Sequence, residues 1–434
     1  MSAAKFKGIA VFKPPAKPRE AFAGRSWANP MEEGPLGRIR WAGWNERTVA
    51  VHAGGNKESD GKFVIAPVVT STTMPTITCD ELAARFENGV VEGRTGGIYE
   101  RLGSKPAFEL ECALTGMHGC GDSIVFGSGM AAISHTILPL VTAGDNVVVH
   151  KTVYGCTDEL FREPLPALGI ETRFIDMRNL KMLDQAIDAR TRAVFFETPS
   201  NPVLDVIEIA KVVDVVNGRC PVIVDNTFAS PRGQNPFEKG AHVVVYSMTK
   251  SIGGHSNAIG GAVLGGGRFI EHLFSIRKDL GGILPAREAS AFLDGIKTLP
   301  LRYEKMQANA IEIARELEAH GEVQRVHYPS LDPGYPFDGQ MKGPGYMVAF
   351  ILKKGLEGGK VLIDNLKVIT HAVSLGSVES LMCHPASTTH ASVPKAEREG
   401  KGISDGLLRI SVGTESLGDI LDDLMQALRK VAEL

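Results

Sequence analysis

The feature that most constrains the fold is an alternation of short apolar runs with amphipathic stretches, which begins at about residue 105. Each apolar run has the length of a buried strand, and each amphipathic stretch has the length of a helix with one apolar face. Strands that alternate with helices predict a parallel sheet covered on both faces. The expected strands are Ser123–Phe126, Asn146–His150, Glu171–Ile175, Ala193–Glu197, Val222–Asp225 and Val243–Ser247.

A second domain is expected after Leu299-Pro300, beginning with the helical run Tyr303–His320. The chain is thus predicted to have an N-terminal arm (1–104) that contacts a neighbouring subunit, a large domain (105–298) and a small C-terminal domain (299–434). The elements predicted in the small domain are strands at Tyr346–Leu352, Val368–Ala372 and Leu407–Ser411 and helices at Gly355–Asn365 and Asp419–Leu434.

The first 47 residues differ from the rest of the chain, because they are rich in basic residues and proline and hold all three tryptophans. They lack the apolar core of a secretory signal. Large aromatic side chains usually become buried. Trp27, Trp41 and Trp44 therefore favour an arm that packs on another part of the protein or on a neighbouring subunit over a disordered tail.

Overall composition argues against several classes of function. A net charge of -3 provides no strong field for nucleic acid or for an acidic membrane surface. The six cysteines are scattered without a C-x-x-C pair, which gives no support to a zinc ribbon or redox motif and favours a reducing compartment. No apolar run has the length of a membrane span. We therefore expect a cytoplasmic protein with neither nucleic acid nor membrane as partner.

A possible cofactor site follows the apolar run Val243–Ser247, which leads into Ser247-Met248-Thr249-Lys250 and a glycine-rich turn. Ligands of α/β proteins bind at the carboxyl ends of parallel strands, where Lys250 would be partly desolvated. Desolvation makes its amine easier to deprotonate, so that it can attack a carbonyl and form a Schiff base. The hydroxyl groups of Ser247 and Thr249 can hold a phosphate. Together these features indicate pyridoxal 5′-phosphate (PLP), whereas the tetrad alone also fits a surface lysine.

Three further positions suit PLP. A buried carboxylate at Asp225 needs a cation, and the protonated pyridine nitrogen would be that cation. Gly129 and Met130 open a helix whose free N–H groups suit a phosphate. Tyr154 follows another strand, where an aromatic ring can stack on the pyridine. Taken singly, Asp225 also fits a turn cap and Tyr154 a core residue.

These motifs, in this order, resemble the Cys/Met-metabolism family of PLP-dependent enzymes of fold type I, from about residue 46 to the C-terminus. The resemblance implies an α/β fold, with a mostly parallel seven-stranded sheet in the PLP-binding large domain and a smaller α/β C-terminal domain. It also implies Lys250 as the Schiff-base lysine, Asp225 as the pyridinium partner and Tyr154 as the ring-stacking residue. The implied phosphate ligands are Ser247, Thr249 and the amides of Gly129 and Met130.

Tyr99-Glu100-Arg101 resembles the family's Tyr-x-Arg segment, which reaches the phosphate of an adjacent subunit. The resemblance therefore implies that Tyr99 and Arg101 bind cofactor in a shared active site. It also implies a homotetramer built as a dimer of dimers.

Arg409 matches the family's arginine that binds the α-carboxylate of the substrate, as the planar fork of a guanidinium suits. Ser374 and Asn201 match the residues that assist it. His384 and His390 lie in another family-like segment without a cluster of further ligands. We expect them to be structural and expect no metal site.

The resemblance also implies chemistry at the γ-carbon of an amino acid. Lys250 would move the α-proton, and Tyr99 or Tyr154 would protonate the leaving group. Elimination to a 2-oxo acid and replacement by a nucleophile share nearly all these residues. We expect α,γ-elimination like that of a methionine γ-lyase. The alternatives are γ-replacement by a cystathionine γ-synthase or O-acylhomoserine sulfhydrylase, or a cystathionine γ- or β-lyase. A non-enzymatic regulator is disfavoured by the complete set of motifs.

Four positions bear on the substrate. Ile98 and Val373 are apolar, as in methionine γ-lyases, where cystathionine γ-lyases carry glutamate. Cys156 resembles a cysteine near the substrate of methionine γ-lyases, although it also fits a small packed residue. Glu159 stands where cystathionine γ-lyases carry an arginine. A carboxylate there would repel a distal acid group and favour a neutral or basic substrate, with canavanine as a candidate, unless Glu159 is simply a solvated helix residue.

Overall fold

The computed structural model describes residues 29–32, 43–54, 64–87, 89–331, 339–389, 391 and 394–434. The chain falls into two compact units. The first comprises the described residues up to Thr142, together with His242–Met248 and Ala258–Lys297. The second comprises Ala143–Ala241, Thr249–Asn257 and the described residues from Thr298 to Leu434. The three-segment division expected from the sequence stays a prediction.

A sheet of seven strands forms the larger layer of the fold. Its strands are β1 (Asp122–Phe126), β2 (Asn146–His150), β3 (Glu171–Ile175), β4 (Thr191–Glu197), β5 (Val222–Asp225), β6 (Val243–Ser247) and β7 (Gly261–Gly265). They lie in the order β1-β7-β6-β5-β4-β2-β3. In the first unit, β7 is antiparallel to both β1 and β6. In the second unit, β5, β4, β2 and β3 are parallel.

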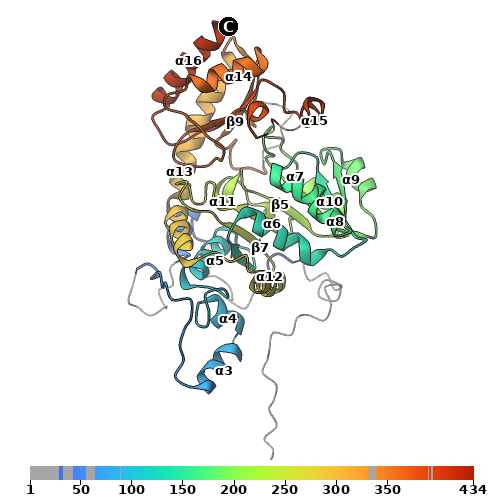
Figure 1. Ribbon diagram of the computed structural model, residues 1–434, viewed down its shortest axis with the longest axis vertical. Helices are drawn as coiled ribbons and strands as arrows, with labels where there is room; N and C mark the ends of the chain where they lie inside the picture. Colours follow the sequence, from blue (N-terminus) through green and yellow to red (C-terminus); the bar gives the residue numbers. More distant parts are fainter. Residues whose placement is uncertain are drawn as a thin grey trace, which may run out of the picture. The chain divides into compact units, whose positions relative to one another are not determined.

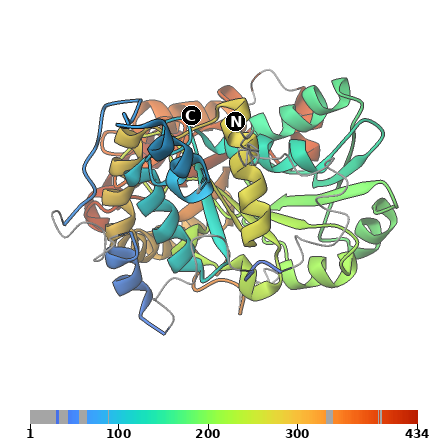
Figure 2. The ribbon, with the colours of Figure 1, turned by 90° about the horizontal axis from the view of Figure 1, so that it is seen from below.

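Helices cover both faces of the parallel strands in the second unit, as the green elements of Figure 2 show. Successive side chains of a strand point to opposite faces. Phe195 of β4 contacts the ring of Phe161, with centroids 5.5 Å apart. Its neighbours Val194 and Phe196 instead join a core cluster that includes Val212. The helices are α7 (Gly155–Arg162), α8 (Pro164–Ala167), α9 (Leu180–Ala186), α10 (Ile209–Val216) and α11 (Ser230–Gly233), followed by the 3-10 helix η2 (Pro236–Lys239).

One helix of the first unit, α5, begins and ends at recognisable caps. For α5, the side chain of Ser104 accepts a hydrogen bond from the backbone N of Ala107, and Gly119 ends the helix at φ 61. The elements of this unit are α2 (Glu46–His52), α3 (Cys79–Glu87), α4 (Gly89–Arg94), α5 (Lys105–His118), α6 (Gly129–Ile137), η1 (Leu138–Leu140) and α12 (Gly267–Leu280).

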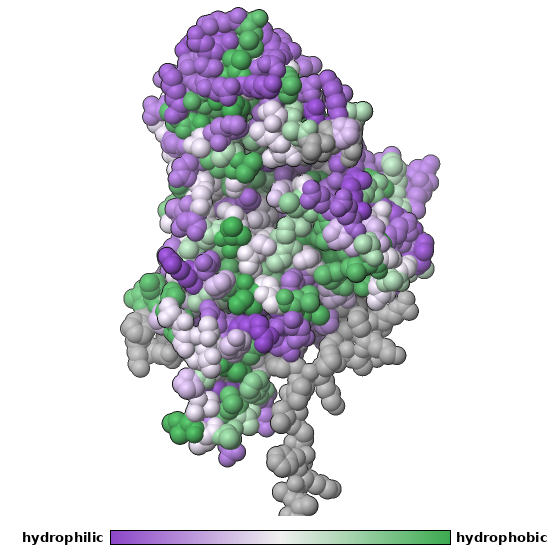
Figure 3. Space-filling model, viewed as in Figure 1, coloured by the Kyte–Doolittle hydropathy of each residue, from purple (hydrophilic) through white to green (hydrophobic). Residues whose placement is uncertain are grey.

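A smaller sheet lies in the C-terminal part of the second unit (Figure 1). Its strands are β8 (Val323–His327), β9 (Met347–Leu352), β10 (Thr370–His371), β11 (Leu381–Cys383) and β12 (Leu407–Ser411), in the order β10-β11-β12-β9-β8. The helices α14 (Gly355–Asp364) and α16 (Leu417–Ala432) bury Leu362 and Leu424 in its core. Mostly hydrophilic residues cover these helices in Figure 3. The remaining elements are α13 (Ala286–Ala319), η3 (Pro385–Ser387) and α15 (Lys395–Gly400).

The expected mixed α/β fold is confirmed, and β2, β3, β5, β6 and β12 have the predicted bounds. The start of a helix at Tyr303 was wrong, because α13 continues through Pro300. Proline removes one backbone hydrogen bond, but Ile296 and Leu299 on the preceding turn are fully buried, so tertiary packing outweighs that loss.

The N-terminal arm is only partly described. Trp44 is 60% exposed, and its packing on another part of the protein or on a neighbouring subunit stays a prediction. Trp27 and Trp41 lie outside the described residues.

Candidate active site

Lys250 lies in the turn that follows β6, and its Nζ donates a hydrogen bond to Oγ of Ser374 at 2.8 Å. Burial, together with the positive charge of Arg409, lowers the pKa of the Lys250 amine to about 8. The backbone is closely packed here, since a Cβ on Gly376 would lie 2.5 Å from the backbone N of Ser251. A substantial fraction of the amine is therefore uncharged near pH 8, as a nucleophile must be.

Asp225 ends β5 with its side chain buried. Its Oδ1 accepts a hydrogen bond from the backbone N of Thr227 at 2.9 Å. Burial raises the pKa of the Asp225 carboxyl to about 6. Among the described residues, no basic side chain forms an ion pair with Asp225, so the site suits an added cation. A protonated pyridine nitrogen offers both the charge and the hydrogen-bond donor.

Arg409 projects from β12 and is buried. Its Nη2 donates to the backbone O of Ser374 at 3.0 Å, and its Nη1 donates to Oδ1 of Asn201. The guanidinium carbon lies 5.8 Å from the centre of the Phe228 ring. The Nε atom is buried without a hydrogen-bond partner in the described structure. A spare, buried donor of this kind suits the carboxylate of a ligand.

Tyr154 immediately precedes α7, and its side chain is 46% exposed. Its phenolic oxygen lies 3.5 Å from Sγ of Cys156. The contact with Cys156 and burial raise the pKa of Tyr154 to about 12. The tyrosine therefore keeps its proton at neutral pH and can act as an acid. Glu159 on the next turn is exposed, and its negative charge adds to the increase in the Tyr154 pKa.

Glu197 is a site residue that the sequence did not reveal. It ends β4, pairs in register with Asp225 of β5 and is 5% exposed. Its Oε1 accepts a hydrogen bond from the backbone N of Tyr154 at 2.7 Å, and its Oε2 accepts one from the backbone N of Asn201 at 3.4 Å. Burial and the adjacent Asp225 raise the pKa of Glu197 well above its usual value. The available signal was an acidic residue at the carboxyl end of an apolar strand.

These contacts bring most of the predicted residues of the second unit into one cluster. From Lys250 the contacts run through Ser374 to Arg409 and Asn201. From Asn201 they continue through Glu197 to Tyr154, with Asp225 on the adjacent strand. Val373, which precedes Ser374, is 60% exposed, and Thr249 precedes Lys250 in the same turn.

Three of the predicted phosphate ligands, Gly129, Met130 and Ser247, lie in the first unit. A Cβ on Gly129 would lie 2.8 Å from Cβ of Ser247, so the first turn of α6 packs tightly against the end of β6. The side chain of Ser128 caps this helix by accepting a hydrogen bond from the backbone N of Ala131 at 3.0 Å. Met130 lies in the same first turn. A helix N-terminus of this geometry suits an anion such as a phosphate.

Tyr99 and Arg101 also lie in the first unit, and both are exposed. Nη1 of Arg101 donates to the backbone O of Lys278, and the guanidinium carbon lies 5.5 Å from the centre of the Tyr99 ring. Ile98, just before them, is 6% exposed and packs in the core. The exposed side chains are available to a neighbouring subunit, and that role stays a prediction.

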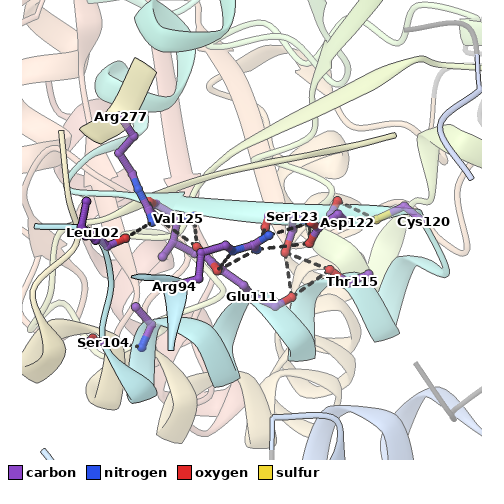
Figure 4. Close-up of polar contacts among 11 residues, drawn as sticks. Arg94, Leu102, Ser104, Glu111, Thr115, Cys120, Asp122, Ser123, Val125 and Arg277 are labelled. Atoms are coloured by element: carbon purple, nitrogen blue, oxygen red, sulfur yellow. Dashed lines mark hydrogen bonds and ion pairs between the residues drawn. The ribbon is translucent and has the colours of Figure 1, made fainter. Parts of the chain in front are cut away.

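A buried ionic network supports this loop (Figure 4). Glu111 on α5 accepts hydrogen bonds from Arg94 at 2.8 and 3.0 Å and from Arg277 at 3.0 Å. Asp122 provides a second carboxylate for Arg94, at 2.6 Å. Arg277 in turn donates to the backbone O of Leu102 at 2.9 Å, which anchors the end of the loop that carries Tyr99 and Arg101.

The histidine segment has an ordinary structural explanation. Nδ1 of His384 lies 2.9 Å from Oγ of Ser387, and Nε2 lies 2.7 Å from the backbone O of Asp405. His390 lies outside the described residues. In the described part of the chain, no group of three or more histidine, cysteine or acidic residues could hold a metal ion.

The fold, together with Lys250 after β6 and the buried Asp225 at the end of β5, defines an enzyme of the PLP-dependent class. The family model for Cys/Met metabolism PLP-dependent enzymes matches residues 47–429, and this chain belongs to that family. PLP is therefore its cofactor, and the mixed seven-stranded fold is fold type I, as the resemblance implied. Within the described residues, no helix has both the length and the apolar character needed to span a membrane.

Individual relatives agree with this assignment. An L-methionine gamma-lyase of Fusobacterium nucleatum subsp. polymorphum is 39% identical, with 88% of this chain and 98% of the relative covered. A cystathionine gamma-lyase of Bacillus subtilis is 36% identical, with 89% of this chain and 100% of the relative covered. The crystal structure of metB from Corynebacterium glutamicum has a TM-score of 0.82 at 33% identity and covers 89% of this chain and 98% of its own.

Proposed function

We propose that this chain catalyses PLP-dependent α,γ-elimination from a γ-substituted L-amino acid, with L-methionine as the leading substrate. The observation that carries the proposal is the continuous set of contacts from Lys250 to Tyr154 through Arg409 and Glu197. The names of the relatives support γ-lyase chemistry, since both methionine and cystathionine gamma-lyases are 36% or more identical to this chain.

In this proposal some residues of the site bind the substrate or the cofactor, and others transfer protons. Arg409 would bind the α-carboxylate of the substrate, because its buried Nε has a donor to spare and Asn201 and Ser374 fix the guanidinium plane. Lys250 would attach the cofactor and, once released, carry protons, since its pKa lies close to neutral. PLP, when bound, supplies the electron sink that stabilises a carbanion at the α-carbon.

Asp225 would keep the pyridine nitrogen protonated through a buried charge pair. Tyr154 would cover the ring and donate a proton to the departing group, because its hydroxyl keeps the proton at neutral pH. Gly129, Met130, Ser247 and Thr249 would hold the phosphate, and Tyr99 and Arg101 would serve the site of a neighbouring subunit in a homotetramer.

Val373 and Cys156 would face the side chain of the substrate and favour an uncharged γ-substituent. Glu159 would act against a second acid group on the substrate. Because Glu159 is exposed, its charge is screened and the expected selectivity is modest. The comparisons give no support to a basic substrate, so canavanine enters the test only as a panel member.

A substrate panel tests the proposal. Purified protein with PLP is supplied with L-methionine, L-cystathionine, L-homoserine and L-canavanine, and 2-oxobutyrate and released thiol are measured together. The expected result is equal amounts of 2-oxobutyrate and thiol from methionine. Turnover of cystathionine alone would contradict the preference for methionine. In a separate assay the protein is supplied with an O-acylhomoserine and cysteine. Formation of a thioether there, without 2-oxobutyrate from methionine, would show γ-replacement instead.

Glu159→Gln provides a matched specificity variant. It keeps the size of the side chain and removes the charge, so it should raise kcat/KM for cystathionine relative to methionine by about two- to fivefold, as expected of one exposed charge. An unchanged ratio would assign Glu159 to the solvated surface.

A further inference from the structure

Glu197 is a buried acidic residue for which the proposed reaction has no direct task. It lies at the carboxyl end of β4, directly beside Asp225 in the register of the sheet, and is 5% exposed. Among the described residues, no basic side chain forms an ion pair with Glu197. Two carboxyl groups buried at adjacent strand ends disfavour each other's ionisation, and burying such a pair costs free energy of folding.

The contacts of Glu197 indicate its role in the site. Its two oxygens accept hydrogen bonds from two backbone N–H groups that belong to different loops, those of Tyr154 and Asn201. Tyr154 immediately precedes α7, where no side chain caps the helix N-terminus, and Glu197 provides a hydrogen-bond acceptor there from another strand. Asn201 lies in the loop after β4 and holds the guanidinium of Arg409.

We propose that Glu197 is a positioning residue that fixes the Tyr154 loop and the Asn201 loop relative to Asp225, and thereby sets both cofactor and substrate affinity. The proposal rests on the proposed function, because it assigns ring stacking to Tyr154 and carboxylate binding to the Arg409–Asn201 pair. Glu197 touches neither the substrate nor PLP in this scheme, and it acts only through the two amides. Loss of its carboxyl group therefore loosens two binding functions at once.

Three variants test the contact with the Tyr154 loop and the contact with the Asn201 loop separately. Glu197→Ala removes both acceptors and breaks these two part-buried hydrogen bonds. Glu197→Gln keeps one oxygen, which should stay with Tyr154, where the bond is shorter at 2.7 Å than the 3.4 Å bond to Asn201. Asn201→Ala removes only the contact with Arg409. Glu171→Gln, on the exposed start of β3, is the matched control away from the site.

The readouts are equilibrium binding rather than turnover. The dissociation constant of PLP is measured by dialysis, and that of L-norleucine by the change in the absorbance of bound PLP. L-Norleucine carries the α-carboxylate but no γ leaving group. Glu197→Ala should raise both constants by about tenfold or more. Glu197→Gln and Asn201→Ala should raise the norleucine constant and leave the PLP constant within about twofold. Circular dichroism and the melting temperature identify a variant that fails to fold.

A double-mutant cycle between Glu197→Ala and Asn201→Ala decides between positioning and general destabilisation. If Glu197 acts through Asn201, the effects on norleucine affinity should be far less than multiplicative. Multiplicative effects on norleucine would overturn the proposal, as would Glu197→Ala binding both ligands like the wild-type protein. If Glu197→Ala does not fold, an unchanged norleucine constant in Glu197→Gln would also overturn it.

The outcome is separable from that of the proposed function. A wild-type protein that binds PLP and norleucine but eliminates from no panel substrate would overturn the proposed function and leave the Glu197 comparison valid. A wild-type protein that binds no PLP would overturn both.

Discussion

Replacing Glu111 by glutamine should destabilise the first unit strongly. In the buried network two guanidinium groups, Arg94 and Arg277, balance two carboxylates, Glu111 and Asp122. The side chains of Arg94 and Glu111 are 0% and 1% exposed, so water does not screen their charges. Glu111→Gln leaves one positive charge without compensation.

The magnitude follows from the contacts that are lost. Glu111 accepts two hydrogen bonds from Arg94, one from Arg277 and one from the backbone N of Val125 at 3.1 Å. A glutamine keeps one acceptor, but its amide group places N–H donors against a guanidinium. Removing one partner of a buried ion pair typically costs about 3–5 kcal/mol of unfolding free energy, and we expect a loss in that range.

Urea unfolding measures this loss, with protein and PLP concentrations held fixed because both affect apparent stability. Glu312→Gln is the matched control, since Glu312 forms an exposed pair with Arg315 on α13 and its loss should cost about 0.3–0.5 kcal/mol. If Glu111→Gln were no more destabilising than Glu312→Gln, the reasoning from an uncompensated buried charge would be refuted.

Four further predictions concern the active site. PLP uptake by the apoprotein should accelerate as pH rises through about 8, because only the uncharged Lys250 amine attacks, and a pH-independent rate would contradict this. The pKa of Lys250 is about 8 in the folded chain and 10.5 ordinarily, so the unfolded chain binds more protons between these two pH values. In that range the unfolding free energy of the apoprotein should therefore rise with pH, relative to that of Lys250→Met. Arg409→Lys keeps the charge but loses the planar fork, so KM for methionine should rise about tenfold or more with a smaller change in kcat, and equal losses in kcat and kcat/KM would point to a different role. If active sites are shared, inactive Arg101→Ala and Lys250→Ala chains should regain activity when mixed, and no recovery in mixed tetramers would argue against sharing.

Several parts of the fold could be predicted because they depend on local pattern. The β-branched apolar runs at β2, β5 and β6 gave strand bounds that agree with the structure. Strand β7 escaped prediction, since its glycines at both ends weaken the apolar signal. The sequence predicted a helix that begins only after Pro300, because proline disfavours the interior of a helix. In the structure, buried residues before and after Pro300 keep helix α13 continuous.

The sequence alone determined the class of chemistry, because the motifs around Lys250, Asp225 and Tyr154 occur in the order typical of PLP-dependent enzymes of the Cys/Met-metabolism family. Only the tertiary structure decided which groups share contacts. Glu197 was indistinguishable from any strand-end acid until the register placed it beside Asp225 and under the amides of two loops. Likewise, no local pattern in the sequence marks Glu111 as a buried acid, and only the tertiary structure pairs it with Arg94 and Arg277. The physical reason is that a strand or helix is specified by near neighbours in sequence, whereas the partner of a buried charge comes from distant segments that meet only in the folded chain.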